Sequence, residues 1–165
     1  LIIEKGKDFK LSHCGAHAMD TMRMESGFLH WGHDISPEEN QYQAGLKFAI
    51  SYKKNINFVG KEALLKIKDQ NPTKSLAMMV LKDNRPGEPL LLHEEPIYLD
   101  DKIIGRTTSG NYSFNFKKNI SFGYVNSGNT IENLVNKNLS IEVEKKKYPV
   151  TIIKKPLNQK NIKDI

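Results

Sequence analysis

The sequence predicts an α+β fold in which a helix-containing first part precedes an antiparallel β-barrel or sandwich. Before residue 72, apolar residues recur at helical spacing in short segments bounded by glycine or proline. After residue 72, they recur in about six short runs of strand length separated by turns, which is typical of a closed antiparallel sheet. This change near Pro72 predicts two domains, residues 1–72 and residues 73–165.

Three helices are expected in the first domain. Residues 1–6 have the pattern of a last helical turn closed by glycine. Because natural domains seldom begin inside a helix, we expect the chain to be a fragment of a longer polypeptide. A second helix is expected over residues 16–26, with Gly27 as its stop. A third is expected over residues 61–69 and ends before Pro72, since the residue before proline resists the helical conformation.

Strands are expected in both domains. One is expected at residues 46–52, because Leu46, Phe48 and Ile50 would share one face of it. Residues 105–110 contain two glycines but lack the spacing of a phosphate-binding loop, so they are assigned to a strand as well. The strands of the second domain are expected at residues 75–81, 97–99, 102–109, 120–125, 139–143 and 150–153.

Arg23 is the strongest candidate for a ligand-binding residue. On a helix over residues 16–26, it falls within an arc of about 160° together with small and apolar residues. A guanidinium keeps its proton, so its place in an apolar arc costs free energy unless an anion meets it. Its planar fork suits a carboxylate. The alternatives are an ion pair with Asp20, one helical turn back, or a side chain that reaches water at the edge of the arc. The other members of the arc are Ala16, Ala18, Met19, Met22 and Ser26, whereas His17, Thr21, Met24 and Glu25 lie on the other side.

Glu25 and the residues of the turn after this helix could stabilise the fold instead of binding a ligand. Glu25 points away from Arg23 on the helix, so we expect it to brace a neighbouring backbone or loop. Trp31 could line a pocket or fill the core, and Asp34 could cap a turn. His30 and His33 are three residues apart without a third ligand, so no metal site is predicted.

Composition excludes several classes of protein. The net charge is +6, yet only three of the 25 basic residues are arginine, whereas base recognition favours arginine, so no nucleic-acid partner is expected. No apolar run approaches the roughly 18 residues of a membrane span, so no membrane partner is expected either. The single cysteine, Cys14, lacks the context of a nucleophile and is expected to be a small buried residue. One cysteine fits a reducing compartment, and the cytoplasm is the expected location.

Several segments together resemble one family. Met22-Arg23-Met24-Glu25-Ser26-Gly27 is similar to the signature Arg-Leu-Glu-x-Gly, and Gly32-His33-Asp34 is similar to the Gly-His/Asn-Asp that follows it. This signature belongs to the folate-dependent aminomethyltransferases. They comprise the glycine-cleavage T-protein and the related C-terminal halves of dimethylglycine and sarcosine dehydrogenases. Five matching segments follow in the family's order, at residues 14–25, 44–46, 58–64, 103–110 and 118–125.

The resemblance implies the C-terminal portion of a folate-binding α/β domain (residues 1–72), followed by the family's C-terminal antiparallel β-barrel (residues 73–165). Arg23 falls on the family arginine that contacts the aminobenzoyl-glutamate part of folate, and Trp31 is the second folate-binding residue we assign. The family's acidic residue near the reactive folate nitrogen lies upstream, so no catalytic residue is assigned. In the tail, Ile162 stands at the position of a family tyrosine.

The expected function is therefore that of a parent protein rather than of this chain alone, which we expect to be inactive. The parent would transfer a one-carbon unit from a glycine-derived or N-methylglycine-type amine to tetrahydrofolate. Its partners would be tetrahydrofolate and the missing N-terminal part of the same protein. FAD is expected only in an upstream domain, if the parent is of the dimethylglycine/sarcosine dehydrogenase type. The alternative is a non-catalytic interaction or regulatory domain that kept the fold.

Overall fold

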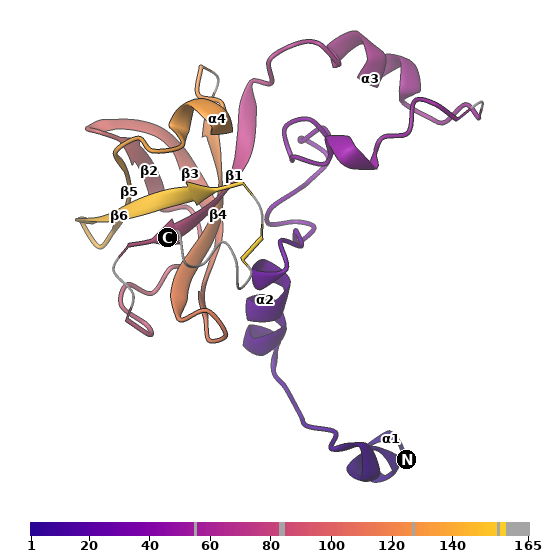
Figure 1. Ribbon diagram of the computed structural model, residues 1–165, viewed down its shortest axis with the longest axis vertical. Helices are drawn as coiled ribbons and strands as arrows, with labels where there is room; N and C mark the ends of the chain where they lie inside the picture. Colours follow the sequence, from indigo (N-terminus) through magenta and orange to yellow (C-terminus); the bar gives the residue numbers. More distant parts are fainter. Residues whose placement is uncertain (55, 83–84, 127, 155, 158–165) are drawn as a thin grey trace.

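The computed structural model describes residues 1–165 apart from 55, 83–84, 127, 155 and 158–165, so Ile162 lies outside the described residues. Its main body is a closed antiparallel barrel with the strand order β1-β4-β3-β2-β5-β6 (Figure 1). This confirms the predicted α+β class and the predicted barrel. The strands are β1 (Lys74–Leu81), β2 (Pro96–Leu99), β3 (Lys102–Ser113), β4 (Lys118–Asn126), β5 (Leu139–Val143) and β6 (Lys146–Ile153).

Apolar side chains at alternate positions along the strands fill the interior of the barrel. Along β5, Leu139 and Ile141 are buried while Ser140 between them is half-buried, so one face of the strand supplies the core. A short helix, α4 (Ile131–Leu134), adds Leu134 to the same core. The other buried members of this cluster are Ala77, Met79, Leu81, Leu91, Ile97, Ile104, Val125, Val150 and Ile152.

Strand β4 differs, because it is buried on both faces. All its residues from Asn119 to Val125 are buried. Val125 belongs to the barrel interior, whereas Ile120 and Phe122 face outward into a second apolar cluster. Met24, fully buried, is part of that second cluster. The outer face of β4 is therefore part of the surface on which the helix that carries Met24 packs.

Helix α2 (Ala16–Glu25) packs against the barrel with a face opposite to the one expected. Thr21, Met24 and Glu25 are buried, whereas Met19 and Met22 are 62% and 52% exposed. The predicted apolar arc was therefore wrong. The arc was assigned from hydrophobicity alone, but the helix docks through a buried carboxylate that finds hydrogen-bond donors on the barrel.

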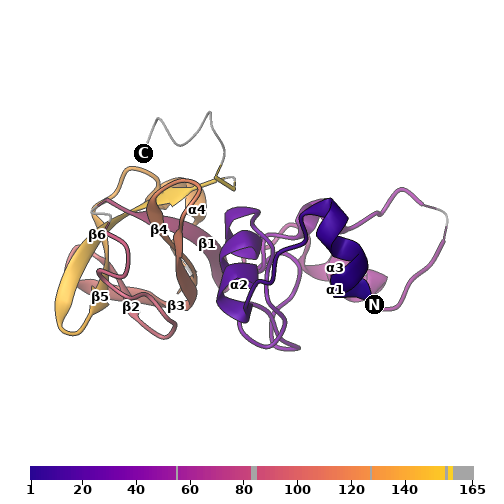
Figure 2. The ribbon, with the colours of Figure 1, turned by 90° about the horizontal axis from the view of Figure 1, so that it is seen from below.

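The other helical elements before β1 lie away from the barrel, as two perpendicular views show (Figures 1 and 2). They are α1 (Ile2–Gly6), η1 (Lys7–Phe9), η2 (Lys47–Ala49) and α3 (Lys61–Ile67). Of the predicted inward side chains of α3, Leu64 is buried but Ala63 is exposed. Among the described residues, none of the helices has the length and hydropathy of a membrane-spanning segment.

Two local predictions for this region were wrong. Residues 46–52 contain the 3₁₀ turn η2 and no strand, and Phe48 is 85% exposed. Their alternating pattern would need a neighbouring strand to pair with, and the described part of the first domain has none. Gly6 does not stop α1 in a left-handed conformation, since its φ is −72°; Lys10 takes that conformation instead.

Gly105 marks a close approach between two barrel strands. It lies in β3, as predicted for residues 105–110, next to the register shift between β2 and β3. A Cβ atom at this position would lie 1.9 Å from the carbonyl oxygen of Tyr124 in β4. Only a residue without a side chain allows the two backbones to come this close.

We therefore expect Gly105→Ala to lower the free energy of unfolding by about 2 kcal/mol or more, because backbone atoms must shift to admit one methyl group. Gly15→Ala is the matched control. Gly15 has a φ of −89° and no atom within 4 Å of an added Cβ, so it should cost less than about 1 kcal/mol. Urea unfolding of both variants measures the difference, and equal losses would contradict the close approach.

Candidate functional site

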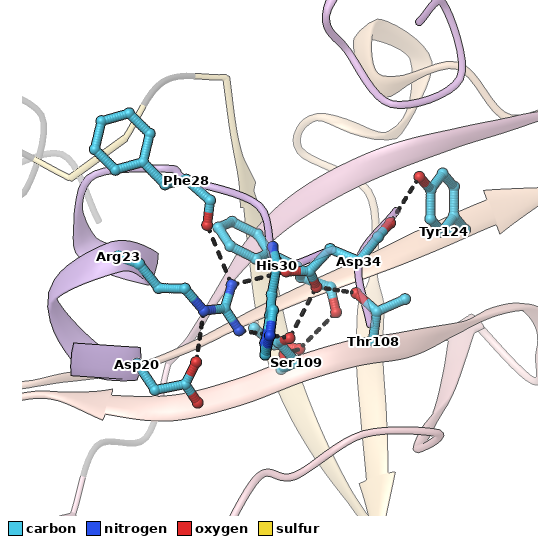
Figure 3. A network of polar contacts seen from close by, with 10 residues as sticks. Asp20, Arg23, Phe28, His30, Asp34, Thr108, Ser109 and Tyr124 are labelled. Carbon is cyan, nitrogen blue, oxygen red and sulfur yellow. Dashed lines mark hydrogen bonds and ion pairs between the residues drawn. The ribbon is translucent and has the colours of Figure 1, made fainter. Parts of the chain in front are cut away.

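Arg23 lies where the end of α2 meets the barrel, and its side chain is only 15% exposed (Figure 3). Nε donates to Asp20 at 2.5 Å, and Nη1 donates to Asp34 at 2.7 Å and to the carbonyl oxygen of Phe28 at 3.1 Å. Nη2 donates to the hydroxyl of Ser109 at 2.9 Å. Of the alternatives to a ligand, the ion pair with Asp20 is present, and the cation also has a second carboxylate partner.

Asp34 is the centre of this network, and its side chain is fully buried. Oδ2 accepts from Arg23 Nη1 and from the backbone N–H of His30, the latter at 2.9 Å. Oδ1 accepts from the hydroxyls of Thr108 and Ser109, at 2.6 and 2.8 Å. The prediction that Asp34 caps a turn is confirmed by the His30 contact. Its bonds to α2 and β3 join the two parts of the chain.

The sequence analysis missed the contribution of Thr108 and Ser109. Both residues lie in β3, and Ser109 is separated from Asp34 by 75 positions in the sequence. The register shift in β3 between Thr107 and Ser109 occurs at this site. Such a shift lets neighbouring residues of one strand point to the same side, which explains how two consecutive hydroxyls reach one carboxylate oxygen. No local pattern in the sequence encodes this contact.

The turn at residues 30–35 carries the second predicted folate-binding residue, Trp31. It forms an isolated bridge with Ile35 and is 64% exposed, so it does not fill the core. The turn is held on the barrel by the hydroxyl of Tyr124, which donates to the backbone carbonyl of Asp34 at 2.9 Å. Burial, together with the nearby carboxylates of Glu39 and Asp34, raises the pKa of Tyr124 far above its ordinary value, so this hydroxyl keeps its proton. Trp31 therefore presents its ring to the outside from an anchored turn.

Glu25 forms the second carboxylate contact between α2 and the barrel. Its Oε1 accepts from the hydroxyl of Ser113 at 2.6 Å, and its Oε2 accepts from Asn115 Nδ2 at 2.6 Å. Glu25 is 8% exposed. The expectation that it braces a neighbouring loop, and does not pair with Arg23, is confirmed.

A cavity of about 750 Å³ borders the network on the side of Thr108 and His33. Inside it, Lys74 pairs with Glu39 at 2.5 Å and lies 4.8 Å from the centre of the Tyr124 ring. Both basic residues that line the cavity are paired within the chain, Lys74 with Glu39 and Arg106 with Glu94. Arg23 does not line this cavity.

Two other sequence expectations concern reactive side chains. Cys14 is exposed, so its predicted burial was wrong; it lies two residues before the start of α2. His30 and His33 lie side by side, with ring centres 4.6 Å apart. Across the described residues, no group of three or more histidine, cysteine or carboxylate side chains is arranged to hold a metal ion.

We expect Asp34→Asn to lower the free energy of unfolding by about 3 kcal/mol, because it leaves the Arg23 cation with one partner fewer inside the interface. Asp101→Asn is the matched control. Its carboxylate is fully exposed and pairs with Lys147 at 3.1 Å, so its loss should cost less than about 1 kcal/mol. Thermal and urea unfolding measure both variants. A loss for Asp34→Asn no larger than for the control would show that the network does not join the two parts.

Glu39 makes the junction sensitive to acid. Burial raises the pKa of the Glu39 carboxyl, but hydrogen bonds from the Lys74 ammonium and from the hydroxyl and N–H of Ser36 lower it, and the net result is a pKa below the ordinary 4.5. A carboxyl whose pKa is lower in the folded state stabilises the fold above the unfolded pKa, and the stabilisation is lost as the pH falls through the folded pKa. We expect Glu39→Gln to cost about 1.5 kcal/mol at neutral pH, and the difference from wild type to vanish at low pH. Urea unfolding across this pH range measures it, and a difference independent of pH would contradict the ion pair.

Two family models match this chain, one in each of its two parts. The glycine cleavage T-protein C-terminal barrel domain matches residues 74–158, and the GCVT N-terminal domain matches residues 1–54. Among solved structures, the glycine cleavage system aminomethyltransferase T from Bartonella henselae aligns with a TM-score of 0.80 over 94% of this chain and 42% of that one. Its sequence identity is 22%, so this alignment supports the fold alone.

Curated relatives carry four kinds of name, of which aminomethyltransferase is one. 4-Methylaminobutanoate oxidase (formaldehyde-forming) of Paenarthrobacter nicotinovorans is 42% identical over 66% of this chain and 13% of the oxidase. Mitochondrial dimethylglycine dehydrogenase of Rattus norvegicus is 32% identical over 94% of the chain and 18% of the dehydrogenase. The mitochondrial pyruvate dehydrogenase phosphatase regulatory subunit of Mus musculus is 31% identical over 76% of the chain and 14% of the subunit.

The chain thus spans less than half the length of each of these proteins. The barrel domain alone accounts for residues 74–158, and both domain matches follow one another in the family's order. The resemblance found in the sequence is confirmed, and the chain belongs to the aminomethyltransferase (glycine cleavage T-protein) family.

Proposed function

We propose that this chain is the C-terminal part of a tetrahydrofolate-dependent aminomethyltransferase-like protein. The parent protein transfers a one-carbon unit from an amine to tetrahydrofolate, and the chain helps to bind the folate. Three features support the proposal: family membership, the fixed guanidinium of Arg23, and the apolar surface of the first domain. The domain boundary near residue 72 belongs to the same proposal.

The fixed orientation of Arg23 is the observation that carries the folate assignment. Asp34 and Ser109 hold the guanidinium from the barrel side. Nη2 has a second N–H, for which no acceptor occurs among the described residues. Such a group suits a carboxylate or carbonyl oxygen of the aminobenzoyl-glutamate part of folate. The residues present therefore fit the ligand.

Trp31 supplies the second expected contact. Its ring is exposed on the anchored turn, and an aromatic ring held in this way can stack on the flat rings of a folate. Tetrahydrofolate, when bound, supplies the nitrogen that accepts the one-carbon unit. The chain itself contributes binding and orientation, which account for much of the rate when two reacting groups are held in place. No catalytic side chain is assigned to it, and we propose that the chain alone does not complete the reaction.

The first domain exposes more large apolar side chains than a self-contained surface needs. They lie on α1 and α2, on η1 and η2, and on the segment that leads into α3. We propose that the N-terminal part of the same protein covers them and completes the folate pocket. They include Leu1, Ile2, Phe9, Met19, Met22, Phe48, Ile56 and Val59.

The relatives point to the class of amine. Two of them are named for dimethylglycine and 4-methylaminobutanoate, which are both N-methylated amino acids. We propose an amine of this class, or a glycine-derived aminomethyl group, as the one-carbon donor. If an FAD-dependent oxidation precedes the transfer, the flavin belongs to another part of the parent protein, since this sequence contains no Gly-x-Gly-x-x-Gly fingerprint. The free, exposed Cys14 suits a reducing compartment, and we propose the cytoplasm.

The second candidate is a non-catalytic interaction or regulatory domain. It is favoured by the relative that is named as a regulatory subunit. It is also consistent with the charge balance at Arg23, because Asp20 and Asp34 neutralise the cation without any ligand. In this case the network has a structural role only.

Titration of tetrahydrofolate into the full-length protein by calorimetry distinguishes the two candidates. We expect saturable binding by the wild type. Arg23→Lys should weaken it about tenfold or more, because lysine keeps a cation beside Asp34 but loses the planar fork. Arg106→Lys is the matched control, since Arg106 is exposed and its one ion-pair partner in the described part of the chain is Glu94. Folded wild type that binds no tetrahydrofolate would favour the regulatory domain.

A further inference from the structure

The two carboxylates that meet Arg23 differ in how firmly they are held. The side chain of Asp34 is fully buried and accepts four hydrogen bonds from α2, the turn and β3. The side chain of Asp20 is 35% exposed, and its single contact among the described residues is with Arg23 Nε. Asp34 can leave only if the junction opens, whereas Asp20 can turn into water by rotation of its own side chain.

The cluster is also over-neutralised. One guanidinium faces two carboxylates, so Arg23, Asp20 and Asp34 together carry one formal negative charge. An anionic ligand that approaches this cluster meets net repulsion as long as Asp20 stays in place. The geometry therefore disfavours a third carboxylate added beside the other two.

We propose that Asp20 is a resident anion that occupies Nε of Arg23 until a ligand carboxylate displaces it. This inference rests on the proposed function and names the part of tetrahydrofolate concerned, its glutamate carboxylates. When the ligand carboxylate binds, Asp20 rotates away, and the total charge around Arg23 is restored by the ligand. Asp34 and Ser109 keep the guanidinium in the same orientation throughout.

This role makes Asp20 a residue that tunes specificity. A ligand without a carboxylate gains nothing from the exchange, because it cannot replace the ion pair that Arg23 would lose. A ligand with a carboxylate regains that pair. The affinity for the anionic ligand is reduced by the free energy needed to release Asp20, since only the form with Asp20 displaced can bind it.

The opposite role for Asp20 is a brace that positions Arg23 for the ligand. The two roles predict changes of opposite sign in ligand affinity when Asp20 is removed. If Asp20 is a resident anion, its removal tightens the binding of a carboxylate ligand. If it is a brace, its removal leaves the guanidinium less well oriented and weakens binding.

The test is calorimetric titration of the full-length protein and its Asp20→Asn and Asp20→Ala variants with tetrahydrofolate and with tetrahydropterin, which lacks the aminobenzoyl-glutamate part. We expect both variants to bind tetrahydrofolate about two- to fivefold more tightly than wild type, the range that corresponds to one partly exposed ion pair. Their affinity for tetrahydropterin should stay that of wild type. Glu132→Gln is the control, because it removes the same charge from an exposed position of helix α4 on the barrel.

Each outcome has one meaning. If the wild type does not bind tetrahydrofolate, the proposed function fails and this inference fails with it. If the wild type binds and the Asp20 variants bind equally or more weakly, the inference alone is overturned and Asp20 is a brace or a bystander. If Glu132→Gln tightens binding as much as Asp20→Asn, the effect is one of net charge and the inference is also overturned.

Discussion

The buried carboxylate of Asp34 is the constraint on which the junction between the two parts of the chain depends. Burial of an ionised carboxylate is costly unless donors surround it. Here the donors come from three segments: the guanidinium of Arg23 on α2, the N–H of His30 in the turn, and the hydroxyls of Thr108 and Ser109 on β3. The carboxylate is satisfied only when all three segments are in place. The same contacts therefore fix the orientation of α2 on the barrel and the direction of the Arg23 side chain.

Helix α2 is consequently a two-sided element. One side, with Met24 and Glu25, belongs to the barrel through an apolar cluster and a second buried carboxylate. The other side, with Met19 and Met22, is exposed. Arg23 lies at the border between them, with 15% of its side chain exposed. One cation therefore contacts the barrel side through Asp34 and Ser109 and pairs with the partly exposed Asp20 through Nε.

The barrel could be predicted from the sequence, but the site could be predicted only in part. Leu139 and Ile141 alternate with polar residues because each strand divides core from solvent, and this pattern is local. The pattern at Leu46, Phe48 and Ile50 is just as regular, yet no strand in the described first domain pairs with it. For the site, the Arg23–Asp20 pair follows from helical spacing. The contact of Asp34 with Ser109 spans 75 positions and depends on a register shift inside β3, which no local pattern reveals.

A charged residue within an apolar helix face does not by itself identify a ligand site. The sequence argument for Arg23 required an anion, and the structure provides two from the chain itself. What separates a structural ion pair from a ligand site is the ease with which each partner can leave. Asp34 is enclosed by four donors, so it belongs to the fold, while Asp20 is half-exposed and held by Arg23 alone among the described residues. Under the proposal made above, ligand binding at this site depends on one quantity. It is the free energy needed to release the Asp20 carboxylate from Nε of the fixed Arg23 guanidinium.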